Sequence, residues 1–262
     1  MKLVPFLTAL AGGVFLSTAA LAADAPGAAE LAAKLSDLQQ DGNTFIRVKM
    51  IVSSPANPSD PKTTLQLQIK SRRTSAGQTD VLYQVLFPKE RKGEAVLISS
   101  NGSGATFTPP DKVQPFDASK FKESLLGGDL SYDDVSDNFF AWKDQSLAGT
   151  ETVGNVSCQI LESKPKGARS TYTMVKSWID TKRMVPLRVE KYSGNQLVRR
   201  IDTSDVANVD GRNVLAMLVI RRAGQPTATE MDGSRIKRGV SYTDADFSAE
   251  GLKNLNGPKG GE

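Results

Sequence analysis

Four aspartates stand within nine residues near the middle of the chain, directly after two adjacent glycines. Carboxylates at this density could ligate a metal ion, act as a pair of catalytic acids, or stabilise the start of a helix. The stretch reads SLLGGDLSYDDVSDNFF, and its glycines and aspartates are Gly127, Gly128, Asp129, Asp133, Asp134 and Asp137.

A calcium loop does not fit this spacing. With Asp129 as the first ligand, Asp134 stands where such a loop needs glycine, and Phe140 stands where it needs a bidentate glutamate. A carboxylate-pair hydrolase needs two acids facing each other across a cleft, which closeness in sequence does not supply. Ser131 and Asp134 instead have the spacing of a capping box. We interpret the aspartates, Asp133 included, as charges and caps at a helix N-terminus.

No other residues form a catalytic set. The sequence contains no histidine, which excludes a Ser-His-Asp triad, a Cys-His pair, a histidine zinc site and a histidine base. Ser234 and Lys237 have S-x-x-K spacing without the companion motifs of such enzymes, and no P-loop or G-x-G-x-x-G turn is present. We therefore expect no enzymatic activity, no metal and no cofactor. An unrecognised hydrolase is the alternative with the least support.

The N-terminus has the layout of a secretory signal peptide. Lys2 precedes an apolar run over residues 3–21, and the small residues of A-L-A at 20–22 form a cleavage site. We expect residues 1–22 to be removed on export. The alternative is an N-terminal membrane anchor, which Gly12 and Gly13 within the run disfavour. Cys158 is the only cysteine, so no disulfide can form within the chain, and its place in a predicted strand indicates a buried side chain.

The remaining chain is mildly basic. The formal charge is +4, and removal of the leader with Lys2 lowers it to +3. This excess is too small to indicate nucleic-acid binding, and pairs such as Arg199-Arg200 and Arg221-Arg222 are typical of solvated strand positions. No Pro-, Gly- or Ser-rich linker divides the chain. We predict one domain over residues 23–257 and a flexible tail over residues 258–262.

Periodicity predicts a mostly β protein. Leu31, Leu35 and Leu38 recur at helical spacing, which predicts a helix over residues 28–40 that Gly42 ends. From residue 43 the period changes to two, with Ile46, Val48, Met50 and Val52 on one face of a strand. Turn signals then arrive at intervals of about ten residues, which suits an antiparallel meander. Later strands are predicted at 146–152, 157–164, 170–180, 185–192, 197–209, 214–222 and 225–231, and a short helix at 247–255.

One interior segment, residues 117–140, breaks the strand rhythm. Its apolar residues recur at helical spacing on both sides of the two glycines: Phe121 and Leu125 before them, and Tyr132, Val135 and Phe139 after them. We predict two short amphipathic helices hinged at Gly127 and Gly128, which lie over the apolar face of the sheet as a lid. The alternative is that these side chains only complete a packed core.

Five stretches resemble, in chain order, the LolA-like outer-membrane lipoprotein-sorting proteins. They are FPKERKGEAVLISS at 87–100, GGDLSYDDV at 127–135, YTMVKSWIDTKRMVPLRVEKYSGNQLVRRI at 172–201, VDGRNV at 209–214 and DFSAEGL at 246–252. The spacing around Trp178, Asp180 and the PLR at 186–188 is the more specific part. The resemblance runs from about Phe87 to Leu255.

The resemblance implies a mainly β fold with a few helices (α+β), an unclosed antiparallel β-barrel whose concave face the helices cover. It implies a hydrophobic cavity for the acyl chains of a lipid or lipoprotein, and carriage through the periplasm of a Gram-negative cell toward the outer membrane. Expected partners are an inner-membrane transporter or exporter and an outer-membrane acceptor. Related members are sensors or exporter partners, so a lipid-sensing or exporter-associated regulatory module is the alternative. Such carriers hold the lid closed with an arginine, for which Arg47 and Arg91 are the candidates in this sequence.

We predict that an acyl chain contacts both the strands and the lid. Strand phase and the lid pattern together give the following cavity and lid residues: Val48, Met50, Leu67, Ile69, Val85, Phe87, Phe121, Leu125, Tyr132, Val135, Phe139, Phe140 and Trp178. Gly127 and Gly128 form the expected lid hinge.

Overall fold

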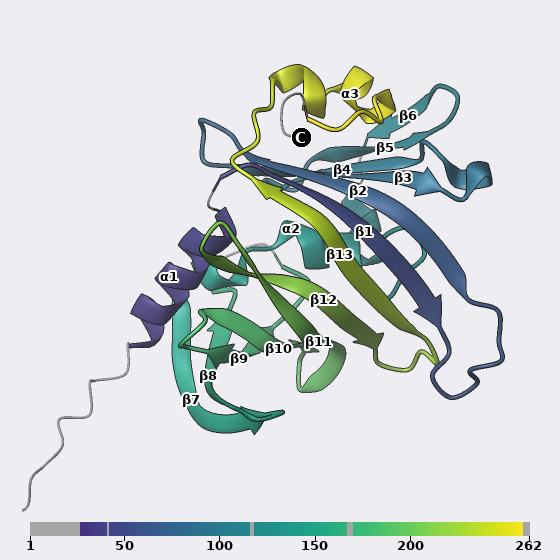
Figure 1. Cartoon of the computed structure of the whole chain (residues 1–262). Coiled ribbons are helices and arrows are strands. Elements are labelled where there is room, and N and C mark those ends of the chain that lie inside the picture. Colours follow the sequence, from purple (N-terminus) through teal and green to yellow (C-terminus); the bar gives the residue numbers. More distant parts are fainter. Residues whose placement is uncertain (1–26, 41, 116–117, 167–169, 259–262) are drawn as a thin grey trace, which may run out of the picture.

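The computed structural model describes residues 27–40, 42–115, 118–166 and 170–258 (Figure 1). The predicted signal peptide, residues 1–22, lies outside the described residues, as does the predicted tail except for its first residue. Among the described helices, none is long and apolar enough to cross a membrane.

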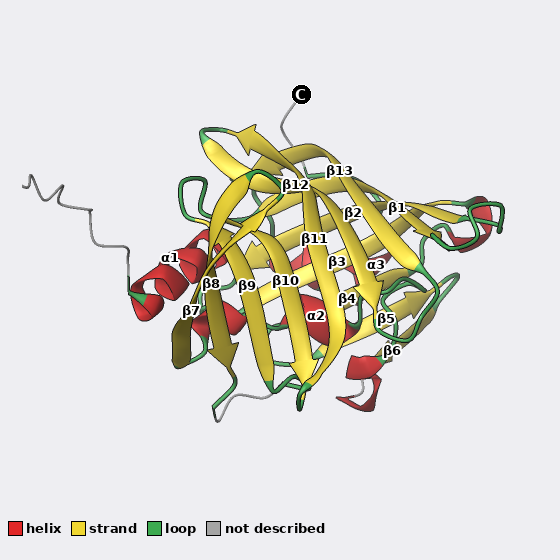
Figure 2. Cartoon of the chain, turned by 90° about the horizontal axis from the view of Figure 1, so that it is seen from below, coloured by secondary structure: helices red, strands yellow, loops and turns green. Residues whose placement is uncertain are grey.

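Thirteen strands form one antiparallel sheet that curves on itself without closing (Figures 1 and 2). The strands are β1 Thr44–Ser53, β2 Thr63–Arg73, β3 Thr79–Phe87, β4 Ala95–Ser99, β5 Gly104–Thr108, β6 Lys112–Pro115, β7 Asp144–Val153, β8 Val156–Lys164, β9 Met174–Asp180, β10 Val185–Ser193, β11 Gln196–Val209, β12 Arg212–Arg222 and β13 Ala228–Arg238. The predicted fold class, an unclosed antiparallel barrel with a few helices, is confirmed.

The strand order explains where the interior segment must go. The order across the sheet is β6-β5-β4-β3-β2-β1-β13-β12-β11-β10-β9-β8-β7, so β6 and β7 form its two edges. The chain between these edges has to traverse the sheet, and it does so on the concave side. Figure 2 shows α2, Tyr132–Ser136, between the two walls of the curved sheet. The connection between the two edge strands, β6 and β7, therefore places this segment over the apolar face of the sheet.

The helices lie on both faces of the sheet. Helix α1, Ala28–Gln40, has the bounds that the sequence predicts and packs against β7 and the 3-10 helix η3, Phe139–Ala141. Two further 3-10 helices are η1, Lys89–Arg91, and η2, Ala118–Lys122. Near the C-terminus, η4, Asp244–Phe247, and α3, Ala249–Lys253, cover the convex face of β3 to β5 instead.

Two apolar clusters fill the concave side. The first lies over β1 to β4 and contains Val48, Leu67 and Val85. The second lies over β8 to β10 and joins Leu31 of α1 to Leu161. Ile201 of β11 packs against both clusters. The strand phase predicted for β1 is confirmed, because Ile46, Val48, Met50 and Val52 all belong to the first cluster.

The interior segment differs from the predicted pair of hinged helices. Residues before the glycines form the 3-10 helix η2, and residues 124–131 form a tight loop closed by a β-bridge between Ser124 and Ser131. Leu126 and Gly127 have φ values of 54° and 90°, the left-handed region, so a helix cannot run through them. The predicted capping box of Ser131 and Asp134 is confirmed at the start of α2. We call residues 121–140 the lid segment.

Candidate functional site

The lid segment buries its apolar side chains against the concave face of the sheet. Leu125, Leu126, Leu130 and Tyr132 are each at most 8% exposed and belong to the cluster over β1 to β4. Gly128 lies so close to the sheet that a Cβ would come within 2.3 Å of Met50 Cε. The glycine therefore serves a close approach, and the lid's own side chains occupy the concave face.

Most of the predicted lining residues lie together. Val48, Met50, Leu67, Val85, Leu125 and Tyr132 are buried in the first cluster, and Ile69 and Val135 pack against it. Phe139 and Phe140 lie in the second cluster, with ring centroids 4.4 Å apart. Phe121 is buried in η2. Their contact with a ligand stays a prediction.

Two predicted lining residues lie elsewhere, and these placements correct the sequence analysis. Phe87 is 48% exposed, because a register shift between Gln66 and Leu67 pairs it with Gln66 instead of continuing the phase of Val85. Trp178 lies in a separate cluster with Cys158, and its neighbour Ile179 faces the concave side. Successive strand residues point to opposite faces, so Trp178 points away.

A row of basic residues crosses three adjacent strands below the lid segment. Lys191 of β10 pairs in register with Arg199 of β11, and Arg199 pairs with Arg222 of β12. Lys191 and Arg199 are only 1% and 5% exposed, whereas Arg222 is exposed. Like charges directly opposite one another destabilise a sheet unless counter-charges compensate them. The expectation of a solvated strand position is therefore wrong for Arg199.

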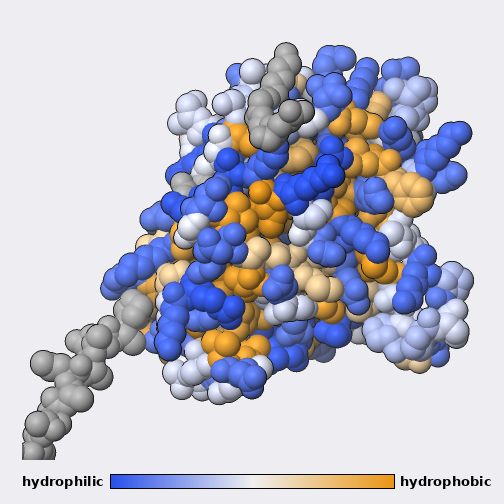
Figure 3. Space-filling view, viewed as in Figure 1, coloured by the Kyte–Doolittle hydropathy of each residue, from blue (hydrophilic) through white to orange (hydrophobic). Residues whose placement is uncertain are grey.

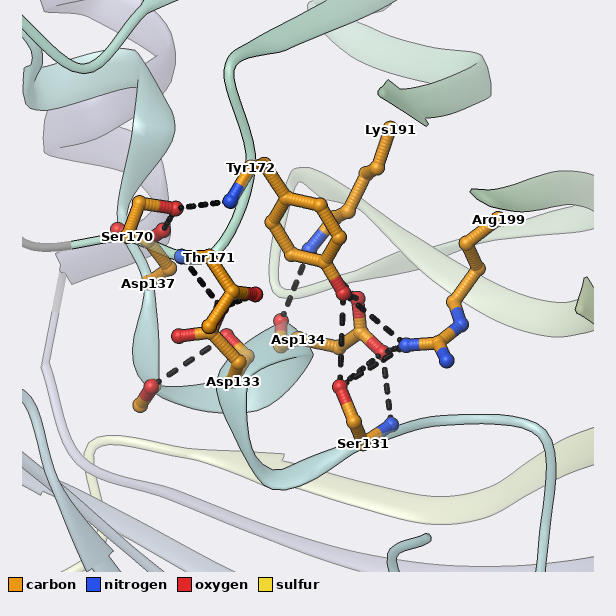
Figure 4. A network of polar contacts seen from close by, with 10 residues as sticks. Ser131, Asp133, Asp134, Asp137, Ser170, Thr171, Tyr172, Lys191 and Arg199 are labelled. Atoms are coloured by element: carbon orange, nitrogen blue, oxygen red, sulfur yellow. Dashed lines mark hydrogen bonds and ion pairs between the residues drawn. The ribbon is translucent and has the colours of Figure 1, made fainter. Parts of the chain in front are cut away.

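Asp134 of α2 supplies the counter-charge for two members of this row (Figure 4). Its side chain is fully buried, and Oδ1 lies 3.0 Å from Lys191 Nζ while Oδ2 pairs with Arg199 Nη1. Tyr172 Oη donates a hydrogen bond of 2.7 Å to Oδ1, and Ser131 N donates one of 2.7 Å to Oδ2. One lid carboxylate thus binds two neighbouring strands at once.

Burial sets the protonation of this network. It lowers the pKa of Lys191 to about 8 and the pKa of Arg199 to about 10, because the charged forms lose hydration, and Arg222 lowers the pKa of Arg199 further. Burial also raises the pKa of Tyr172 to about 12. At neutral pH the two bases are therefore cationic and Tyr172 is a neutral hydrogen-bond donor.

The other three aspartates also attach the lid segment to the body of the protein. Asp129 accepts from Thr229 Oγ1 of β13 at 2.7 Å and from Thr227 Oγ1 at 2.9 Å. Asp133 accepts from Thr171 N at 3.0 Å.

Asp137 completes the set of attached aspartates. It accepts from Ser170 Oγ at 2.7 Å, and burial raises its pKa to about 6. Within the described residues, no three His, Cys, Asp or Glu side chains gather as a metal site would require. The aspartates act as attachment points of the lid segment.

Comparisons with known proteins agree with this architecture. A family model described as an uncharacterized protein matches residues 77–254, which is more than half of the chain. A DUF1329 family protein from Desulfovibrio piger has a TM-score of 0.78 at 21% identity over 86% of this chain and 97% of its own. An outer membrane lipoprotein-sorting protein domain from Vibrio parahaemolyticus has a TM-score of 0.76 at 19% identity, covering 87% and 98%.

A LolA superfamily protein from Nitrosomonas europaea has a TM-score of 0.68 at 20% identity, covering 86% of this chain and 98% of its own. No curated protein matches the sequence. The chain belongs to the family that this model describes, and its fold is LolA-like.

In this LolA-like chain, two arginines contact the lid segment from different sides. Arg91 of η1 donates from Nη1 to the carbonyl of Leu126 at 3.1 Å, and Glu94 holds it in place at 2.6 Å. Arg199 binds Asp134. Arg47, the other predicted candidate, lies 5.3 Å over the ring of Phe45 instead.

Sequence analysis missed Lys191 and Arg199 in the LolA-like site. A signal was present, since Lys191 continues the alternating apolar residues Val185, Leu187 and Val189 at steps of two. A charged residue in the buried phase of a strand usually has a buried partner.

Proposed function

We propose that this LolA-like protein is a non-enzymatic periplasmic carrier that holds acyl chains of a lipid or lipoprotein between the lid segment and the concave face of the sheet. The observation that carries the proposal is the lid itself. Four of its apolar side chains, Leu125, Leu126, Leu130 and Tyr132, occupy the concave face over β1 to β4, and a few polar contacts attach the lid to the strands. An acyl chain would replace those four side chains.

The energies of the two states are close. Leu125, Leu126, Leu130 and Tyr132 contribute about 1.5–3 kcal/mol each when buried, or roughly 6–12 kcal/mol together. An acyl chain with about 14 methylenes gains about 11 kcal/mol on the same surface, at about 0.8 kcal/mol each. A near balance permits binding and release without covalent chemistry, which is what a carrier requires.

The buried ion pairs of Asp134 set the barrier between these states. Separating them exposes Lys191 and Arg199, both of which are then free to bind water. A salt bridge between buried groups contributes little net stability when water can replace it, but it fixes one geometry. The lid is therefore held in a defined closed position at small net cost.

Periplasmic location and delivery toward the outer membrane belong to the same proposal. Both are supported by the signal-like N-terminus and by the likeness to a protein described as an outer membrane lipoprotein-sorting domain. Surface composition is compatible with a carrier that travels through water, since hydrophilic residues interrupt the apolar atoms visible on the face shown in Figure 3.

The experiment is native mass spectrometry of the protein recovered from the periplasm, followed by lipid extraction. We expect one acyl-bearing molecule per protein, and its transfer to acceptor vesicles would distinguish a carrier from a sensor. Recovery of an empty protein that also fails to bind fluorescent fatty acid would contradict the proposal.

Two matched variants would test whether the acyl chain binds beneath the lid. Val135 faces the first cluster from α2 and is partly buried, whereas Val113 of β6 is 37% exposed. Val135→Asp places a charge beneath the lid and should weaken fatty-acid binding by about tenfold or more. Val113→Asp should leave binding unchanged.

A further inference from the structure

A pocket opens beside the lid segment, and its chemistry differs from that of the apolar concave face. It has a volume of about 270 Å³. The end of β10, the start of β11 and the end of β12 meet the start of α2 at this pocket. Its lining includes the basic residues Lys122, Arg199 and Arg222, together with hydroxyl groups of Ser131, Tyr172 and Ser193. No carboxylate residue belongs to the described lining.

Arg199 lines this pocket, and one edge of its guanidinium is unused. Its hydrogen bonds to described residues all leave from Nη1, which donates to Asp134, to Ser131 Oγ at 2.9 Å and to Tyr172 Oη at 3.1 Å. Its Nε is buried and has no hydrogen-bond partner among the described residues. A guanidinium offers two parallel N–H groups along the Nε edge, a geometry that matches carboxylate and phosphate oxygens.

The positive charges around this pocket also exceed the negative charges that are paired with them. Asp134 compensates Lys191 and Arg199, but no described carboxylate forms an ion pair with Arg222, which stands directly opposite Arg199 in the sheet. The nearby carboxylates of Asp129 and Asp133 are engaged by Thr229 and Thr171. An anion in the pocket would compensate the like charges of Arg199 and Arg222.

The position of the pocket relative to the apolar face suggests which anion fits. Along β11 and β12 the next pair on the same face after Arg199 and Arg222 is Ile201 and Ile220, and both belong to the apolar clusters. Two residues along a strand span about 7 Å. The charged pair Arg199 and Arg222 therefore lies about 7 Å from the apolar pair Ile201 and Ile220. A lipid with an anionic head group has the same arrangement, with a charged group next to an apolar chain.

We propose that this pocket binds the phosphate or carboxylate of the carried molecule's head group, with Arg199, Arg222 and Lys122 as its ligands. The inference rests on the proposed carrier function and adds the head-group class to it. Arg199 thereby couples lid attachment to anion binding, because it binds the lid through Asp134 and also faces the anion.

The test compares two probes with the same acyl chains, a diacyl phosphatidylglycerol and a neutral diacylglycerol, with inorganic phosphate as a third. The variant is Arg222→Gln, which changes an exposed residue and should not affect folding. The matched control is Arg221→Gln on the same strand, whose side chain alternates to the other face and pairs with Asp202 at 3.2 Å.

We expect the wild-type protein to bind phosphatidylglycerol about tenfold or more tightly than diacylglycerol. Arg222→Gln should remove most of this preference without changing diacylglycerol binding, and Arg221→Gln should keep it. Equal binding of the two lipids by the wild type, unchanged in Arg222→Gln, would overturn the head-group site and leave the carrier function standing.

The phosphate probe separates the sources of the anion. Binding of inorganic phosphate that Arg222→Gln weakens would support an anion site even if neither lipid bound, although that result would remove the carrier function. Failure of all three probes would overturn both proposals.

Discussion

Replacing Asp134 with asparagine should release the lid segment from the sheet. Asparagine has nearly the same shape and its amide oxygen can still accept from Ser131 N, so the cap of α2 is largely kept. What disappears is the charge. Lys191 and Arg199 then remain buried without the carboxylate that forms an ion pair with both of them.

The expected magnitude follows from burial. The side chains of Asp134, Lys191 and Arg199 are 0%, 1% and 5% exposed. Removing one partner of a buried ion pair typically costs about 3–5 kcal/mol, because the remaining charge loses its compensation. For a protein of this size that corresponds to a Tm lower by about 6–20 °C.

The assay combines chemical unfolding with hydrogen exchange. Asp133→Asn is the matched control, because Asp133 is also buried but accepts hydrogen bonds from Thr171 and forms no ion pair in the described structure. We expect this control to lose about 1–3 kcal/mol. In Asp134→Asn, amides of residues 131–136 should exchange much faster, while those of β9 change only with global stability.

A second variant isolates the electrostatic cause. Adding Lys191→Met to Asp134→Asn removes one of the two uncompensated cations and should restore about 1–3 kcal/mol. If Asp134→Asn costs no more than Asp133→Asn, or if Lys191→Met restores nothing, the role assigned to the buried ion pairs is refuted.

Three further predictions concern the attachment of the lid and of the C-terminal segment. Burial raises the pKa of Asp137 to about 6 from 3.8, so the folded protein holds this proton more tightly and its stability should fall as pH rises from about 4 to about 6, by up to about 3 kcal/mol. Asp137→Asn should remove this part of the pH dependence in urea unfolding, and an identical slope in both proteins would contradict the assignment. Gly127→Ala should cost about 1–3 kcal/mol because the residue has φ +90°, whereas Gly127→Asn should cost less; equal losses would argue against backbone strain as the cause. Gln84 is fully buried and its Nε2 donates to the carbonyls of Leu252 and Asn254, so Gln84→Leu should loosen the C-terminal segment and speed its proteolysis, and an unchanged cleavage rate would count against this attachment.

Local patterns predicted the elements well. The helix over residues 28–40 depended on Leu31, Leu35 and Gly42, and the strand phase of β1 depended on a run of alternating residues. Both signals act within one element, so neighbouring sequence contains them. The capping box of Ser131 and Asp134 was predicted for the same reason.

The polar part of the site was not predicted, because it depends on pairing between strands and segments that are distant in sequence. Lys191 and Arg199 become neighbours only through the β10–β11 register, and Asp134 reaches them from a segment that crosses the whole sheet. A bulge likewise moved Phe87 out of its predicted phase. Register shifts and edge-to-edge crossings depend on the complete sheet, so local periodicity cannot reveal them.

The place where an acyl chain binds is the central claim, and photo-crosslinking tests it most directly. A fatty acid with a diazirine at its methyl end would be bound, irradiated and mapped by mass spectrometry. The account predicts labels on the concave face and the lid, among them Leu67, Val85 and Leu126. Labels on the convex face around Leu82 and Leu252, or no saturable labelling at all, would contradict it.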